Sequence, residues 1–235
     1  MPRASAPELM DDPAIGVAEL EESFRFIRGV NRWLGGARAL VEALESLHAA
    51  GEWPRDRPLH LLDVGTGIAD LPEAAWRWAK RRGLEIAIVG IDPSSATIEL
   101  ARARLQREAP DAPIALRVAG VEALDPNDGY DLAHAAMLLH HFDDPGVERA
   151  LAAMGAAART VLWNDLWRQP LSQAAVRVMT LASAPVVRHD AILSVDKGFT
   201  PAEMHERARA AGLRVQRLRR MPMSGRLVAT MRREA

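Results

Sequence analysis

The sequence predicts an α/β fold, a Rossmann-like, doubly wound sheet of seven strands that is mostly parallel, with the last strand antiparallel. Three observations lead to this prediction. Short apolar runs alternate with amphipathic helical stretches between residues 59 and 166, which is typical of a parallel sheet with crossover helices. The apolar run 61–64 enters a turn with two glycines and then a helix. A second apolar run, 86–91, ends on Asp92.

The periodicity of apolar residues places the elements in order. Apolar positions recur at helical spacing from residue 15 to residue 50, and Gly35-Gly36 should divide this stretch into two helices. Residues before about 14 are polar and contain proline, so we expect them to be mobile. The core is predicted to have strands at 59–64, 86–91, 114–118, 130–135 and 160–166, and helices at 71–82, 95–108 and 147–156.

The C-terminal third carries a helix and a strand pair. Thr200, Pro201 and Glu203 form a capping sequence for a helix that Gly212 should end, and 214–218 with 226–231 is predicted to be an antiparallel pair. Residues 167–199 are an apolar insertion, interpreted either as a lid over an acceptor pocket or as one more packing helix. We therefore expect a single domain over 1–235: a helical cap (15–50), a core (59–166), the lid (167–199) and a C-terminal helix and strand pair (200–235).

Composition narrows the class of protein. The chain has 235 residues, 49% of them hydrophobic, a formal net charge of −1 and no cysteine. This length and composition suit one globular domain, and disulfides, thiolate metal sites and a cysteine nucleophile are excluded. The near-neutral charge gives no general attraction to nucleic acid, and no apolar run is long enough to span a membrane. We expect a cytoplasmic protein, and the abundance of Ala and Arg favours a bacterial source.

The glycine turn and Asp92 predict a nucleoside pocket. Gly65 and Gly67 allow close approach of the backbone, and Asp92 can accept hydrogen bonds from two ribose hydroxyls. Asp70 stands where a dinucleotide site has its third glycine and would repel a diphosphate, whereas Asp63 suits a cationic group. A ligand with a ribose and an ammonium group but no phosphate, S-adenosylmethionine, fits best. A nicotinamide-dependent oxidoreductase and a turn without ligand are the alternatives.

At this motif the chain resembles the class I S-adenosylmethionine-dependent methyltransferases, whose first motif reads acid-x-Gly-x-Gly. The third glycine often seen in that family is Ala69 here, and Gly120 stands where the family usually has an acid after its third strand. The resemblance implies cofactor contacts from Asp63, Gly65, Thr66, Gly67, Asp92, Pro93, Gly120, Val121, Glu122, Ala136 and Met137.

Residues 130–144 resemble the fourth-strand motif of the ubiquinone/menaquinone-type small-molecule methyltransferases. That resemblance implies that Ala135, Ala136 and Met137 line the methionine and sulfonium side of the cofactor. His140 and His141 follow directly, and a neutral imidazole there could deprotonate a phenol. The alternative is a structural role at a helix start. Because adjacent side chains diverge, we expect no metal at this pair.

Four further residues are predicted to bind the acceptor. Asn164 lies at the tip of the fifth predicted strand, next to Asp165, which alternatively caps a helix. Arg188 and His189 fall inside the apolar insertion, where Arg188 could pair with Asp190. Residues 31–36, the His140-His141 pair and the triplet 188–190 together resemble a bacterial subgroup of polyketide phenol and quinone methyltransferases, which implies that Arg32 meets the methionine carboxylate or the acceptor. The basic C-terminus raises RNA as an acceptor, but no aromatic residues are interleaved there for base stacking.

These observations predict an S-adenosylmethionine-dependent methyltransferase that acts on a hydrophobic small molecule, most simply by O-methylation of a phenol or quinol. C-methylation of an activated ring needs the same base and stays open. So does a non-catalytic module that only binds S-adenosylmethionine. The sequence leaves a homodimer open as well.

Overall fold

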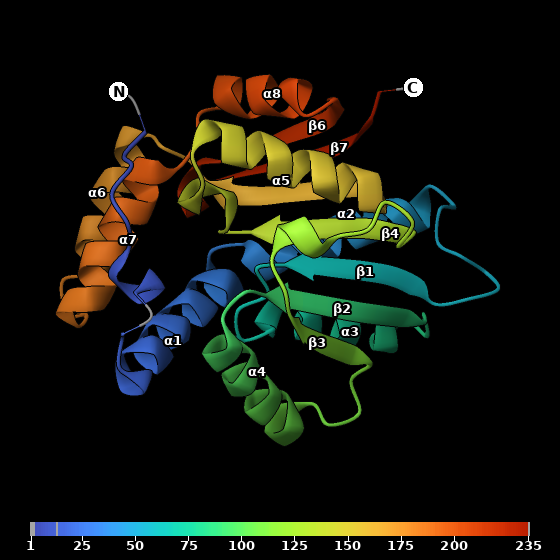
Figure 1. Cartoon of the computed structure of the whole chain (residues 1–235), viewed down its shortest axis with the longest axis horizontal. Helices are drawn as coiled ribbons and strands as arrows, with labels where there is room; N and C mark the ends of the chain where they lie inside the picture. Colours follow the sequence, from blue (N-terminus) through green and yellow to red (C-terminus); the bar gives the residue numbers. More distant parts are fainter. Residues whose placement is uncertain (1–2, 13, 235) are drawn as a thin grey trace.

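The computed structural model describes residues 3–12 and 14–234, which build one seven-stranded sheet covered by helices (Figure 1). The strand order is β3-β2-β1-β4-β5-β7-β6. β7 pairs antiparallel with both neighbours, and the remaining pairs are parallel, as predicted. The strands are β1 (Leu59–Val64), β2 (Ile86–Asp92), β3 (Ile114–Val118), β4 (Tyr130–Ala136), β5 (Ala158–Leu166), β6 (Leu213–Met221) and β7 (Arg226–Arg233).

Helices cover both faces of the sheet because its central strands are apolar on both sides. Leu62 and Val64 of β1 belong to a core that includes α5 (Asp144–Ala157) and α8 (Pro201–Ala210). Leu61, on the opposite face of the same strand, packs in a core with α2 (Gly36–Ala49) and α3 (Asp70–Arg81). The helix α4 (Ser95–Glu108) contacts β2 and β3 at the edge of the sheet.

Side-chain caps fix the starts of three helices. Ser94 Oγ accepts a hydrogen bond from Thr97 N, and Thr200 and Glu203 cap reciprocally as the sequence predicted. α5 begins three residues earlier than predicted because the Asp143 carboxylate accepts from Gly146 N and a proline fits the first turn.

A separate group of helices lies beyond the carboxyl ends of β1 and β4. It consists of α1 (Val17–Trp33), α6 (Pro170–Met179) and α7 (Pro185–Lys197), seen together at one side of Figure 1. The apolar insertion 167–199 thus forms two helices. We expected the N-terminal segment to be mobile, but it is held against α7. Ala4 N donates to Asp196 O, and the Asp190 carboxylate accepts from Leu9 N and Met10 N.

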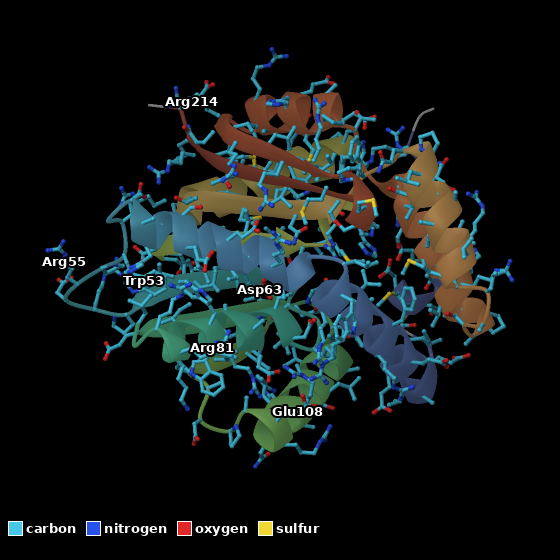
Figure 2. The ribbon with its side chains drawn as sticks, turned by 180° about the vertical axis from the view of Figure 1, so that it is seen from behind. Trp53, Arg55, Asp63, Arg81, Glu108 and Arg214 are labelled. Carbon is cyan, nitrogen blue, oxygen red and sulfur yellow. The ribbon has the colours of Figure 1, made fainter. Side chains whose placement is uncertain are left out.

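The topology leaves a crevice at one end of the sheet. The chain runs outward from β1 through β2 to β3 and returns to β4 on the other side of β1. Ligands of doubly wound folds bind at this switch point. Figure 2 labels Asp63, near the end of β1, close to the middle of the molecule, and Arg55 in the loop farthest from α6 and α7. Over the described residues, no helix is long and apolar enough to cross a membrane.

Candidate active site

A cavity of about 990 Å³ occupies this crevice. It is walled by the turns after β1, β2 and β4, by α1, α6 and α7, and by the segment that precedes α1. Pockets for one drug-sized ligand measure roughly 300–1,000 Å³. The cavity is therefore large enough for a nucleoside cofactor together with a small acceptor.

The turn between β1 and α3 presents bare main chain to the cavity. Gly65 and Gly67 have φ values of +65° and +52°, in the left-handed region that favours glycine. A Cβ on Gly65 would come within 2.7 Å of Leu138 Cδ1. Thr66 Oγ1 is buried in this turn and has no hydrogen-bond partner in the structure. The turn is thus shaped for close contact with a ligand.

Asp92 ends β2 and lines the cavity, and Pro93 follows it there. Its two carboxylate oxygens accept from Gly67 N at 3.1 Å and Ser94 N at 3.0 Å. Burial raises the pKa of Asp92, and these two hydrogen bonds oppose that rise. The hydrogen bonds fix the carboxylate at the rim, and its further lone pairs can accept from vicinal hydroxyls.

Two more carboxylates lie at the same end of the cavity. Asp63 Oδ1 is 2.6 Å from His134 Nδ1, and Asp70 accepts a hydrogen bond from Asn31 Nδ2. Burial raises the pKa of Asp70. Among the described residues that line the cavity, none is lysine or arginine. This end would repel a diphosphate and attract a cation, and with the glycine turn and Asp92 it fits S-adenosylmethionine.

The two histidines follow β4 in a short 3₁₀ helix, Leu139–His141, and both line the cavity. Ala136 and Met137 precede them and also line it. The side chain of His140 is 1% exposed, and its Nδ1 lies 2.6 Å from Asp165 Oδ1. The side chain of His141 is 22% exposed, and its Nδ1 lies 2.8 Å from Asp11 Oδ2.

Glu8, from the segment before α1, faces both imidazoles. Glu8 Oε1 lies 3.5 Å from His140 Nε2, and Oε2 lies 3.8 Å from His141 Nε2. Lys197 Nζ contacts the same carboxylate at 3.2 Å. This ionic cluster connects the N-terminal segment, the turn after β4 and the end of α7.

The cluster determines the protonation of His140. Burial lowers the pKa of His140, but Asp165 and Glu8 on its two sides outweigh burial and raise it to about 9. Burial raises the pKa of Glu8, but His140, His141 and Lys197 lower it to about 2. In this arrangement His140 therefore carries a proton at neutral pH.

The residues that follow β3 lie outside the cavity lining. Gly120, Val121 and Glu122 were predicted to meet the adenine. Val121 instead packs against the core that contains α5, and the Glu122 carboxylate folds back against Gly120. These contacts turn the segment toward the body of the domain.

The four predicted acceptor residues are also absent from the lining. Arg32 is exposed and stacks on Trp33, and Arg188 is exposed on α7. Asn164 is fully buried, where its amide donates to Gly36 O and accepts from Arg226.

Asp190 has other partners than the arginine that the sequence suggested for it. It does not pair with Arg188: its carboxylate accepts from Leu9 N and Met10 N and contacts His189 Nδ1. His189 itself lies at the surface with its side chain 52% exposed. Backbone N–H groups of the N-terminal segment thus bind the Asp190 carboxylate in place of Arg188.

Sequence reasoning missed Glu8, Asp11 and Arg226, and it treated Asp165 only as a helix cap. Asp165 neighbours Asn164 in β5, and because successive strand residues point to opposite faces, only one of them could reach His140. Arg226 is fully buried below the cavity and donates to Leu34 O, Asn31 Oδ1, Asn164 Oδ1 and Met137 Sδ. Burial lowers its pKa to about 10.

Comparison with known proteins agrees with this site. Residues 61–160 match the family described as a methyltransferase domain. A ubiquinone biosynthesis O-methyltransferase of Paramagnetospirillum magneticum is 31% identical over 55% of this chain and 55% of its own length. Its counterpart in Rhodopseudomonas palustris is 33% identical over 37% of this chain and 32% of its own. The matched part of the chain thus spans about half or less of the length of these curated relatives.

Solved structures show the same fold. Magnesium protoporphyrin IX methyltransferase from Synechocystis PCC 6803, with bound SAH, superposes with a TM-score of 0.61 at 14% identity, over 95% of this chain and 90% of that one. An O-methyltransferase from neocarzinostatin biosynthesis was solved in complex with S-adenosyl-L-homocysteine and 1,4-dihydroxy-2-naphthoic acid. It superposes with a TM-score of 0.55 at 20% identity, over 74% of this chain and 49% of that one. Residues 61–160 thus match a methyltransferase domain, and the chain has the fold of these methyltransferase structures.

Proposed function

We propose that this chain transfers the methyl group of S-adenosylmethionine to an oxygen of a hydrophobic phenol or quinol. The observation that carries the proposal is one cavity that joins two sets of groups. The glycine turn and Asp92 lie at one end, and the His140–Asp165 pair lies beside it. Alternatives with the same cofactor are C-methylation of an activated ring and a module that binds without catalysis.

The acceptor end of the cavity supports an uncharged, apolar acceptor. Its walls come from α1, α6 and α7, in support of the roles of cap and lid proposed for 15–50 and 167–199. They include Ile27, Val30, Leu171, Val176, Met179 and Val187. With no lysine or arginine among the described lining residues, an acceptor carboxylate would find only the imidazoles of His140 and His141 and would also face Glu8 and Asp190.

The chain contributes alignment, exclusion of water and a place for a proton. S-adenosylmethionine supplies an electrophilic methyl group when bound. Asp92 and the turn at Gly65 and Gly67 would hold its nucleoside, and the apolar walls would keep the acceptor oxygen in line with that methyl group. His140 already holds a proton at neutral pH, so His141, which is partly exposed to the cavity, is the better candidate for the general base.

Measurement of S-adenosylhomocysteine release with alkyl phenols tests the proposal. We expect turnover by the wild type and a loss of 10²–10⁴-fold in His141→Ala, the usual contribution of a general base. His140→Ala tests the same role for its neighbour. His205→Ala, which removes an exposed histidine of α8, should not change the rate. Unchanged turnover in both cavity variants would remove the base and leave alignment alone.

A binding measurement separates the remaining alternatives. Calorimetric titration with S-adenosylhomocysteine should give tight binding in either catalytic case. Tight binding with no turnover on any phenol or activated ring would favour the non-catalytic module. A cytoplasmic location, a homodimer and the adenine contacts of Gly120, Val121 and Glu122 stay predictions.

A further inference from the structure

Three side chains that the cofactor does not need converge at the edge of the acceptor cavity. They are Glu8, His140 and His141, and one ligand atom from each lies within 4.8 Å of the other two. We propose that this cluster binds one divalent transition-metal cation, with Zn²⁺ as the best-suited ion. Imidazole nitrogens and a carboxylate oxygen are ligands that Zn²⁺ accepts, and two histidines with one glutamate are a known catalytic set.

The two imidazoles are oriented as metal ligands would be. Each ring has its Nδ1 next to a carboxylate, Asp165 for His140 at 2.6 Å and Asp11 for His141 at 2.8 Å. This contact places the proton on Nδ1 and leaves the lone pair of Nε2 free in the neutral ring. Metal-binding histidines are held in the same way by carboxylates in their outer shell. Both Nε2 atoms face Glu8.

His140 Nε2 is a buried atom without a hydrogen bond. The side chain of His140 is 1% exposed, and the Glu8 oxygen 3.5 Å from Nε2 makes an ion-pair contact with it but no hydrogen bond. A buried polar nitrogen without a partner is costly. A metal ion between His140 and Glu8 would bind both groups and satisfy this atom.

The separations between the ligand atoms approach those of a metal site. Bonds of 2.0–2.2 Å in a tetrahedral site place ligand atoms about 3.3–3.6 Å apart. Glu8 Oε1 lies 3.5 Å from His140 Nε2, Glu8 Oε2 lies 3.8 Å from His141 Nε2, and one ligand atom of each residue lies within 4.8 Å of the other two. The three side chains would therefore move closer together to bind one ion. The sequence suggested that adjacent histidines diverge. They do not diverge here, because the 3₁₀ turn brings their ring centroids to 4.4 Å with an interplanar angle of 33°.

The charge of the cluster attracts a cation. Glu8, Asp11 and Asp165 are the carboxylates in direct contact with the two rings, Lys197 is the one cation that contacts Glu8 in the described structure, and the charge of Arg226 interacts with Asp165. With both imidazoles neutral, three negative and two positive charges leave a net charge of −1. A metal ion bound there would replace the proton that His140 otherwise holds.

Three protein ligands leave a fourth position for a molecule in the cavity. The use of that position rests on the proposed function with one difference: a His141 that binds Zn²⁺ through Nε2 cannot accept the phenol proton, so the metal ion would take over the task given there to a general base. A phenol oxygen bound there would release its proton to solvent, because a divalent metal ion stabilises the anion. The phenolate would then form a bond to the sulfonium methyl carbon as the carbon–sulfur bond breaks, which leaves neutral S-adenosylhomocysteine.

Metal titration of the full chain, without a histidine tag and after dialysis against chelator, tests the site. We expect one Zn²⁺ per chain by calorimetry and a visible ligand-field spectrum with Co²⁺. Glu8→Gln and His141→Ala should weaken Zn²⁺ binding by at least tenfold, whereas Glu21→Gln and His205→Ala, at exposed positions, should not. The absence of saturable binding, or equal affinity in the two site variants, would overturn the proposal.

Two further measurements keep the result interpretable. Asp11→Asn, which changes only the outer partner of His141, should weaken Zn²⁺ binding by about 10–100-fold, and its thermal unfolding shows whether the fold is intact. Binding of S-adenosylhomocysteine is measured in the same samples. If the chain binds S-adenosylhomocysteine but not Zn²⁺, the metal site is wrong and the proposed function is unaffected. If it binds Zn²⁺ but transfers no methyl group, the proposed function is wrong and the metal site is unaffected.

Discussion

Asp92 shows how a single residue sets ligand recognition at the end of a strand. Both of its oxygens are aligned by backbone N–H groups of Gly67 and Ser94, so the carboxylate is held in place before a ligand arrives. Burial raises its pKa, which means that the charged form gains from every additional donor. Ribose hydroxyls are such donors.

Replacement of Asp92 by alanine should therefore weaken S-adenosylhomocysteine binding by roughly tenfold to a hundredfold. Hydrogen bonds to a charged group contribute about 1.5–3 kcal/mol, and about 1.4 kcal/mol corresponds to a tenfold change in affinity. Calorimetry measures the dissociation constant, with Asp111→Ala, an exposed aspartate after α4, as the control. An unchanged constant in Asp92→Ala would show that the sugar binds elsewhere.

At the scale of elements, the turn between β1 and α3 depends on close packing as well as on backbone conformation. Gly65 and Gly83 have nearly equal φ values, +65° and +67°. A Cβ on Gly65 would meet Leu138, whereas a Cβ on Gly83 would meet nothing within 4 Å. The two positions thus share the backbone penalty and differ in the steric one.

Comparison of Gly65→Ala with Gly83→Ala should isolate that steric penalty. Each substitution should lower the free energy of unfolding by about 1–2 kcal/mol for a left-handed residue. Gly65→Ala should lose about 1–3 kcal/mol more through overpacking. Urea unfolding followed by circular dichroism measures both. Equal losses would mean that Leu138 moves aside freely.

The N-terminal segment is an element held by contacts far along the chain. Both oxygens of Asp190 accept backbone hydrogen bonds, from Leu9 at 2.8 Å and from Met10 at 2.9 Å. These contacts keep Glu8 at the histidine pair. They act together with the Ala4 N–Asp196 O hydrogen bond and the Glu8–Lys197 ion pair.

Asp190→Ala should therefore release the segment locally without unfolding the sheet. Loss of two charge-assisted hydrogen bonds should speed hydrogen exchange at Leu9 and Met10 by tenfold or more, since each bond contributes about 1.5–3 kcal/mol. Exchange followed by mass spectrometry gives the rates. Asp196→Ala on the same helix is the matched control, because it removes a side chain that contacts Gln173 and keeps the backbone oxygen that accepts from Ala4 N. Equal rates in both variants would contradict a restraint by Asp190.

At the scale of the whole molecule, the sequence predicted what is local and missed what is distant. The strand 114–118 was predicted to the residue, and the caps at Ser94 and Thr200 were found, because each depends on neighbours within a few positions. The contact between Glu8 and Lys197 joins residues 189 positions apart, and no periodicity of the sequence predicts it. Arg226 has no local signal either, although it holds β5, β7 and α1 together.

The charge distribution over the whole cavity predicts which cofactor stabilises the fold. Asp63, Asp70 and Asp92 line it, and the described lining contains no lysine or arginine, so a sulfonium nucleoside is favoured and a diphosphate is repelled. S-adenosylmethionine at a hundred times its dissociation constant should stabilise the fold by about 2.7 kcal/mol. At about 2–4 °C per kcal/mol for a chain of this size, Tm should rise by about 5–10 °C. NADH at the same concentration should leave Tm unchanged in a thermal-shift assay. A rise with NADH of similar size would show that the carboxylates do not govern the choice of cofactor.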